Sequence, residues 1–111
     1  MKSLPVLTPI CCGPDTPPLA PAAAAALAAR FKALADPTRI GIVNRLAAAP
    51  EVCVCDLTAA FGLSQPTISH HLRVLRDVGL VESTKRGTWS YYRLVPEAVV
   101  PLRDALGGVA A

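Results

Sequence analysis

The chain has 111 residues, of which 52% are hydrophobic, and its formal net charge at pH 7 is +3. This length predicts a single domain, and no apolar run reaches the roughly 18 residues that a membrane-spanning helix needs. Pro5 and Pro9 interrupt the apolar start of the chain, which argues against a signal peptide, so we expect a cytoplasmic protein with no membrane partner. The high apolar content of so short a chain predicts a homodimer.

Residues 1–21 are predicted to form an extended, flexible arm. They contain six prolines, each of which fixes φ and lacks a backbone donor, so no helix is expected there. The arm also carries an adjacent pair, Cys11 and Cys12. The composition changes abruptly at Ala22, and we expect residues 22–111 to form the folded domain.

Two helices are predicted at the start of this domain. Residues 22–36 are alanine-rich and strongly favour a helix. Asp36 is then expected to cap a second helix, with Pro37 at its first position. Apolar residues at helical spacing predict the buried faces: Leu27, Phe31 and Leu34 in the first helix, and Ile40, Val43 and Leu46 in the second.

A second cysteine pair, Cys53 and Cys55, precedes a short third helix predicted over residues 57–61. Asp56 is its expected N-cap, and Gly62 can take the left-handed conformation that ends it. Residues two apart share one side of an extended chain but point about 200° apart on a helix. Both cysteines are therefore expected in the extended lead-in, with their thiols on one side.

A fourth helix is predicted after the turn at residues 62–64. Ser64 is its expected N-cap, Leu63 and Ile68 form a hydrophobic staple, and Gly79 ends it. Ile68, Leu72 and Leu75 are its expected buried stripe.

The last third of the chain predicts a β-hairpin and one more helix. Residues 80–84 and 88–95 are rich in β-branched and aromatic residues, with a hairpin tip at 85–87. The final helix is expected within 97–106, starting near Pro101 because proline disfavours a helix interior.

A helix, a tight turn, a second helix and a basic hairpin together predict a mainly α fold with a small β-hairpin, a winged helix-turn-helix. Residues 64–95 hold five basic and two acidic residues, a difference that equals the net charge of the whole chain. A localised basic face favours a polyanionic partner, and the second helix of such a unit enters the DNA major groove. The expected DNA contacts are Ser64, Gln65, Thr67, Ser69, His70, Arg73 and Arg76 from this helix, and Lys85 and Arg86 from the hairpin tip.

Four segments closely resemble the bacterial ArsR/SmtB family of metal-responsive repressors: KALADPTRIGIVNRL (32–46), CVCDL (53–57), LSQPTISHHLRVLRDVGLV (63–81) and RGTWSYYRL (86–94). CVCDL resembles the thiolate motif of the arsenic- and cadmium-sensing branches. The resemblance implies a homodimer that binds double-stranded operator DNA without metal and releases it when metal binds. It also implies dimer contacts through the first and last helices, here at Leu27, Phe31, Leu102 and Leu106.

The resemblance implies a thiolate site at Cys53 and Cys55, but two sulfurs are too few for tight capture of a soft ion. Trivalent arsenic prefers three sulfurs, and cadmium, lead or zinc take three or four, so we expect Cys11 and Cys12 to supply the rest. Some arsenic sensors of the family carry a third cysteine where this chain has Thr58. We favour As(III) as the inducer, with Cd(II), Pb(II) or Zn(II) as alternatives. The histidine-containing site of zinc-sensing relatives is expected to be absent, because the last helix has Asp104 but no histidine.

Two other functions are considered for the same cysteines. A thiol-redox switch would use disulfides within either pair. An enzyme, such as an arsenate reductase or a disulfide exchanger, would need a cysteine in an electropositive pocket or at a helix N-terminus. Because Asp56 follows Cys55 and no base is evident, we do not expect an enzyme.

Overall fold

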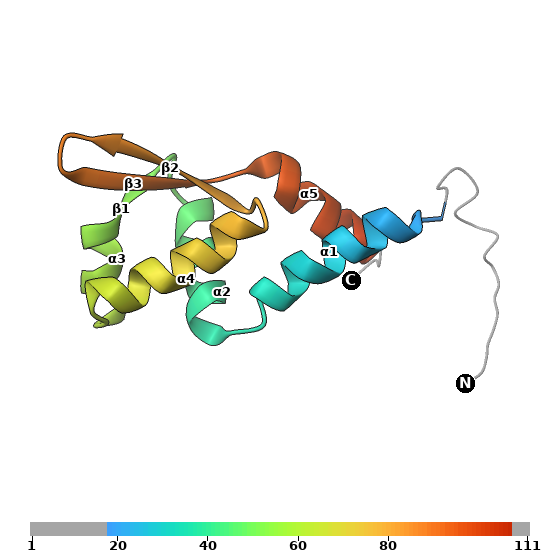
Figure 1. Cartoon of the computed structure of the whole chain (residues 1–111), viewed down its shortest axis with the longest axis horizontal. Coiled ribbons are helices and arrows are strands. Elements are labelled where there is room, and N and C mark those ends of the chain that lie inside the picture. The colour runs from blue at the N-terminus through green and yellow to red at the C-terminus, as the bar shows by residue number, and fades with distance from the viewer. Residues whose placement is uncertain (1–17, 108–111) are drawn as a thin grey trace.

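The computed structural model describes residues 18–107, so the arm up to residue 17, with Cys11 and Cys12, lies outside the described part. Within it the elements follow in this order: α1 (Pro21–Ala33), α2 (Pro37–Ala47), β1 (Val52–Cys53), α3 (Val54–Phe61), α4 (Gln65–Asp77), β2 (Val81–Arg86), β3 (Trp89–Leu94) and α5 (Pro96–Ala105) (Figure 1). None of the helices in this range is long and apolar enough to cross a membrane.

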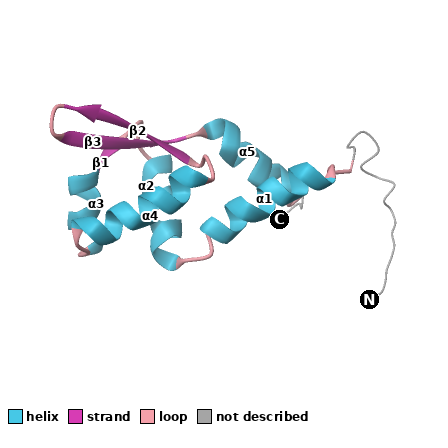
Figure 2. Cartoon of the chain, viewed as in Figure 1, coloured by secondary structure: helices cyan, strands magenta, loops and turns pink. Residues whose placement is uncertain are grey.

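The helices and the sheet are arranged around α4, which contacts α1, α2 and α3. Figure 2 shows α1 and α5 together at one end of the molecule and α3 with the turn of the β2–β3 hairpin at the other. Helix α3, the turn at residues 62–64 and α4 form a helix-turn-helix, and the hairpin forms its wing. The mainly α, winged helix-turn-helix architecture expected from the sequence is therefore confirmed.

Two helix starts follow the local signals expected for them. The Asp36 carboxylate accepts hydrogen bonds from the backbone N–H groups of Thr38 at 2.9 Å and Arg39 at 3.1 Å, with Pro37 in the first turn of α2. These bonds lower the pKa of Asp36, chiefly through the N–H of Arg39. Ser64 caps α4 by accepting a hydrogen bond from the N–H of Thr67.

The core is apolar, and the described residues include no buried polar or charged side chain. The expected stripe of α4 is confirmed, because Ile68, Leu72 and Leu75 are fully buried. The expected face of α2 is partly wrong: Ile42 is fully buried, whereas Ile40 is 53% exposed. Leu46 lies four positions after Ile42, about 40° away around the helix, but six positions after Ile40, about 120° away, so Ile42 rather than Ile40 shares its buried face.

The expected dimer residues divide into two kinds. Leu27 and Leu102 are buried within the single chain, where α1 packs against α5. Phe31 is 38% exposed and Leu106 is 66% exposed, so these two side chains remain available to another surface.

The sheet has three antiparallel strands in the order β1–β3–β2. Strand β1 pairs Val52 with Tyr92 and Cys53 with Tyr91. Arg86 pairs with Trp89, so the turn consists of residues 87 and 88. The expected tip at 85–87 is therefore wrong, and Lys85 and Arg86 lie in β2. A two-residue turn is short enough to need a positive φ, which Gly87 supplies at 64°.

Helix α5 begins at Pro96 rather than near Pro101, which lies inside it. Pro96 suits the first turn, where a missing N–H costs nothing. Burial of Ala98 and Leu102 continues the helix past Pro101. Interior proline costs about 3 kcal/mol, an amount that this packing must offset.

Candidate functional site

Helix α3 begins three residues earlier than the sequence indicates. Cys53, with φ −74° and ψ 144°, is its N-cap, and the Cys53 sulfur accepts a hydrogen bond from the backbone N–H of Cys55 at 3.3 Å. Asp56 is not the cap but an acidic residue of the first turn, where a negative charge favours the helix dipole. The expectation that both cysteines are extended is therefore wrong, because Cys55 is helical.

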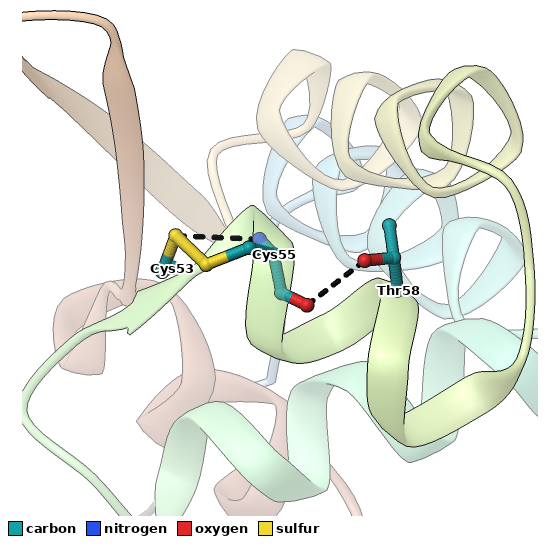
Figure 3. The surroundings of a disulfide bond; sticks show 3 residues. All are labelled: Cys53, Cys55 and Thr58. Carbon is teal, nitrogen blue, oxygen red and sulfur yellow. Dashed lines mark hydrogen bonds between the residues drawn. A yellow bond between two sulfur atoms is a disulfide. The ribbon is translucent and has the colours of Figure 1, made fainter.

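The two sulfurs nevertheless meet. The N-cap residue is extended, so its side chain folds back over the first turn, and the Cα atoms lie 5.2 Å apart. In the structure, Cys53 and Cys55 are joined by a disulfide (Figure 3). Cys53 is buried, whereas Cys55 is exposed, so solvent reaches the pair from the Cys55 side.

The Thr58 hydroxyl donates a hydrogen bond to the carbonyl oxygen of Cys55 at 2.8 Å (Figure 3). Thr58 occupies the position at which some arsenic sensors are expected to carry a third cysteine. Here its side chain stabilises the first turn of α3 and supplies no sulfur.

A cavity of about 210 Å³ adjoins the cysteine pair. Three elements contribute its lining: Cys53, Val54, Cys55 and Thr58 around the start of α3, Gln65 at the start of α4, and Thr88, Trp89 and Ser90 from the hairpin. Trp89 is 55% exposed and is the chain's single tryptophan. The cysteine pair therefore lies where the helix-turn-helix meets the wing.

Cys53 and Cys55 are the only sulfur donors among the described residues. Over residues 18–107, no group of three or more His, Cys, Asp or Glu side chains is arranged to hold a metal ion. Once the disulfide is reduced, two adjoining thiolates suit a soft ion. Cys11 and Cys12 lie outside the described residues.

The expected DNA-contacting residues of α4 mostly face solvent. Ser64, Gln65, Thr67, His70, Arg73 and Arg76 are exposed, and Ser69 is half-buried. His71 is half-buried, and its Nδ1 accepts a hydrogen bond from Arg39 at 3.2 Å. Ser64 is the N-cap, and four of the other five exposed side chains, all but Arg76, lie in the first three turns of the helix.

The two hairpin residues differ from each other. Lys85 is exposed in β2. Arg86 instead forms a two-point ion pair with Glu51: Nη1 donates to Oε1, and Nη2 donates to Oε2 at 2.9 Å. Its guanidinium also lies 4.7 Å from the centre of the Tyr91 ring, and the hydrogen bond to Glu51 raises its pKa. Sequence reasoning missed the contact of Arg86 with Tyr91 across the hairpin, and it missed Glu51 because no local pattern pairs residues 35 positions apart.

Comparisons with known proteins identify the family to which this architecture belongs. The model of the arsR family of bacterial regulatory proteins matches residues 36–83. The arsenical resistance operon repressor of Bacillus subtilis is 46% identical over 70 residues, which cover 63% of this chain and 67% of that protein. This chain belongs to the ArsR family.

Other relatives agree with this ArsR assignment. The arsenical resistance operon repressor of Escherichia coli is 54% identical over 66 residues, 60% of this chain, but the match spans only 56% of the repressor's length. A homodimeric winged helix-turn-helix DNA-binding domain from Mycobacterium bovis, a possible ArsR-family regulator, has a TM-score of 0.65 and 29% identity and covers 82% of this chain and 87% of that chain. A cadmium resistance regulatory protein homolog of Staphylococcus aureus is 43% identical over 72 residues, 65% of this chain and 60% of that protein.

The matched family is one of bacterial regulatory proteins, and the relatives reported above carry the names of repressors and regulators rather than of enzymes. Among these ArsR relatives, some are named for arsenical resistance and one for cadmium resistance.

Proposed function

We propose that this ArsR protein is a homodimeric repressor that binds operator DNA and releases it when trivalent arsenic binds Cys53 and Cys55. The observation that carries the proposal is the meeting of the two sulfurs at the start of α3, beside Gln65 of α4 and Trp89 of the wing. The relatives named arsenical resistance operon repressors support arsenic over cadmium as the inducer.

In this proposal α4 enters the major groove with its N-terminal end toward the bases. Gln65 and Thr67 are exposed in the first turn, where short polar side chains reach base edges or phosphate. Arg73 and Arg76 are exposed further along α4, and with Lys85 of the wing they contribute phosphate contacts.

Release follows from the role of Cys53 as a helix cap. When three thiols bind arsenous acid, three As–S bonds form and three waters leave, so no oxidant or reductant is needed. The Cys53 sulfur then binds arsenic and no longer accepts the hydrogen bond from the backbone N–H of Cys55. The first turn of α3 must adjust, and because α3 packs on α4, the adjustment reaches the helix that reads DNA. We propose that Cys11 or Cys12 supplies the third sulfur.

The test uses Cys53→Ser and Cys55→Ser in the full-length, reduced protein. Operator affinity is measured by fluorescence anisotropy with and without arsenite. We expect both variants to bind the operator within about twofold of wild type, because serine is a preferred N-cap and the variants lie off the exposed face of α4. Arsenite should release the wild type only. Normal release of both variants would show that these cysteines are not the sensor.

The arm and the ion are tested separately. Cys11→Ser and Cys12→Ser, alone and together, show which arm sulfur completes the site, since loss of arsenite response requires loss of a ligand. X-ray absorption counts the sulfur neighbours of the bound ion. Three neighbours support an arsenic site, whereas four on cadmium or lead, with release by those ions and not by arsenite, favour the alternative inducers.

The disulfide between Cys53 and Cys55 favours a second candidate, a thiol-redox switch on the same scaffold. Peroxide would accept two electrons and two protons from the two thiols, giving the disulfide and two waters. Peroxide-driven release of the operator, with no response to arsenite or cadmium, would support this candidate over the first.

A further inference from the structure

We propose that Glu51 competes with DNA phosphate for Arg86, and that this competition links the cysteine pair to the wing. The inference rests on the proposed function and adds a second route to it. Besides the contact of α3 with α4, the sheet itself connects Cys53 to a residue that would otherwise contact DNA.

The ion pair occupies the groups that a phosphate would need. Both terminal nitrogens of Arg86 donate to the Glu51 carboxylate. Arginine binds a phosphate through the same two-point geometry, so Arg86 cannot engage both anions fully at once. The side chains of Arg86 and Glu51 are 55% and 32% exposed, so water and DNA reach the pair and a phosphate can displace the carboxylate.

The sheet connects this pair to the cysteines. Glu51 precedes β1 by one residue, and Cys53 ends that strand. Cys53 pairs with Tyr91 of β3, which pairs on its other side with Thr84 of β2. The Arg86 guanidinium lies over the ring of the same Tyr91. Glu51, Cys53, Tyr91 and Arg86 thus form a closed chain of contacts.

The structure shows this chain of contacts with the sulfurs of Cys53 and Cys55 joined and Arg86 held by Glu51. An ion bound by both cysteines would also join the two sulfurs. Joining them fixes the end of β1 against the first turn of α3, and so fixes the carboxylate next to β1. The loaded protein therefore withholds Arg86 from DNA, and the thiol form, with a freer β1, yields it to a phosphate.

The experiment compares Glu51→Gln with Glu82→Gln. Glu82 accepts a hydrogen bond from Arg93 at 2.5 Å near the base of the same hairpin, so the control makes the same change of charge at another solvent-accessible ion pair on the sheet. For the reduced dimer without arsenite, we expect Glu51→Gln to bind the operator about threefold to tenfold more tightly than Glu82→Gln. The slope of log affinity against log salt should steepen by about 2, one phosphate contact per protomer.

Arg86→Gln then identifies the group through which Glu51 acts. In that background, Glu51→Gln should give no gain beyond that of Glu82→Gln, because the arginine that it frees is gone. With arsenite, the ratio between free and loaded affinities should fall at least about threefold in Glu51→Gln relative to the control. Equal behaviour of Glu51→Gln and Glu82→Gln overturns the competition, and an unchanged arsenite ratio overturns the link to the cysteines.

These outcomes remain separable from the fate of the proposed function. If arsenite fails to release even the wild type, the inducer assignment fails, while the measurements without arsenite still decide the competition for Arg86. If the cysteine variants no longer release the operator with arsenite and Glu51→Gln behaves like Glu82→Gln, the sensing role of the cysteines is supported and the link through Arg86 of the wing is refuted.

Discussion

Gly41 lies where α2 meets α3, and replacing it with alanine tests how tightly the cysteine-bearing helix is packed. A Cβ at this position would lie 2.8 Å from Cε1 and 3.1 Å from Cζ of the Phe61 ring. Ordinary carbon contacts are about 3.5–4.0 Å, so the ring or the two helices must move by roughly 0.7 Å or more.

Two effects of opposite sign set the magnitude. Overpacking of this kind costs about 1–3 kcal/mol. Alanine within a helix is better than glycine by about 0.5–1 kcal/mol. The overpacking term is larger, so Gly41→Ala should lower the free energy of unfolding by about 1 kcal/mol and the midpoint of thermal unfolding by about 4–8 °C.

The assay is urea unfolding of the reduced protein at one fixed concentration, because the stability of a dimer depends on concentration. Phe61→Leu provides the matched background, since it removes the ring edge that Gly41→Ala would meet. There Gly41→Ala should be stabilising, by about 0.5–1 kcal/mol. A stabilising effect in the wild-type background as well would refute the close approach of α2 and α3.

Three further predictions concern other parts of the fold. Ser64→Ala should lower the free energy of unfolding by about 1 kcal/mol, measured in urea, because α4 loses its cap. Arsenite should change the emission of Trp89, which lines the cavity beside the cysteines, but not in a variant with both cysteines replaced by serine. The Arg39 N–H lowers the pKa of Asp36 below 3.8. The ionised Asp36 carboxylate therefore stabilises the folded state above pH 3.8, and this contribution to the free energy of unfolding is lost as pH falls through the folded-state pKa. Asp36→Asn should remove that part of the acid dependence of urea unfolding.

Helix α4 was predictable because its signals are local. Ser64 marks its start, Gly79 follows its end, and the stripe of Ile68, Leu72 and Leu75 sets its buried face. Each signal lies within a few residues of the feature that it determines. The winged helix-turn-helix could be predicted from such signals, because its helices and strands follow one another directly in the sequence.

The start of α3 was not predictable in the same way. Asp56 is the more usual cap residue, and cysteine is not among the preferred ones. The structure favours Cys53 because its backbone is already extended by pairing with Tyr91, 38 residues later in the chain. The pairing of Cys53 in the sheet therefore determines that it caps the helix, and no local sequence pattern indicates that pairing.

Arg86 shows the same limit at the candidate DNA surface. Its charge and its place in a basic hairpin favour a phosphate contact, as for Lys85. The fold brings Glu51 to it across the sheet, which couples two charges that the sequence presents as independent. The sequence could identify the cation but not its partner within the protein.

Strand β1 is only two residues long, yet it covers an edge of the central strand β3. Without it, the backbone groups of β3 at Tyr91 and Tyr92 would face outward unpaired. Open strand edges template association between copies of a protein, leading to precipitation. Substitutions that loosen residues 51–53 should therefore lower the solubility of the protein, independently of any effect on sensing. If such a variant aggregates, the cause is the exposed edge of β3 rather than the loss of a ligand.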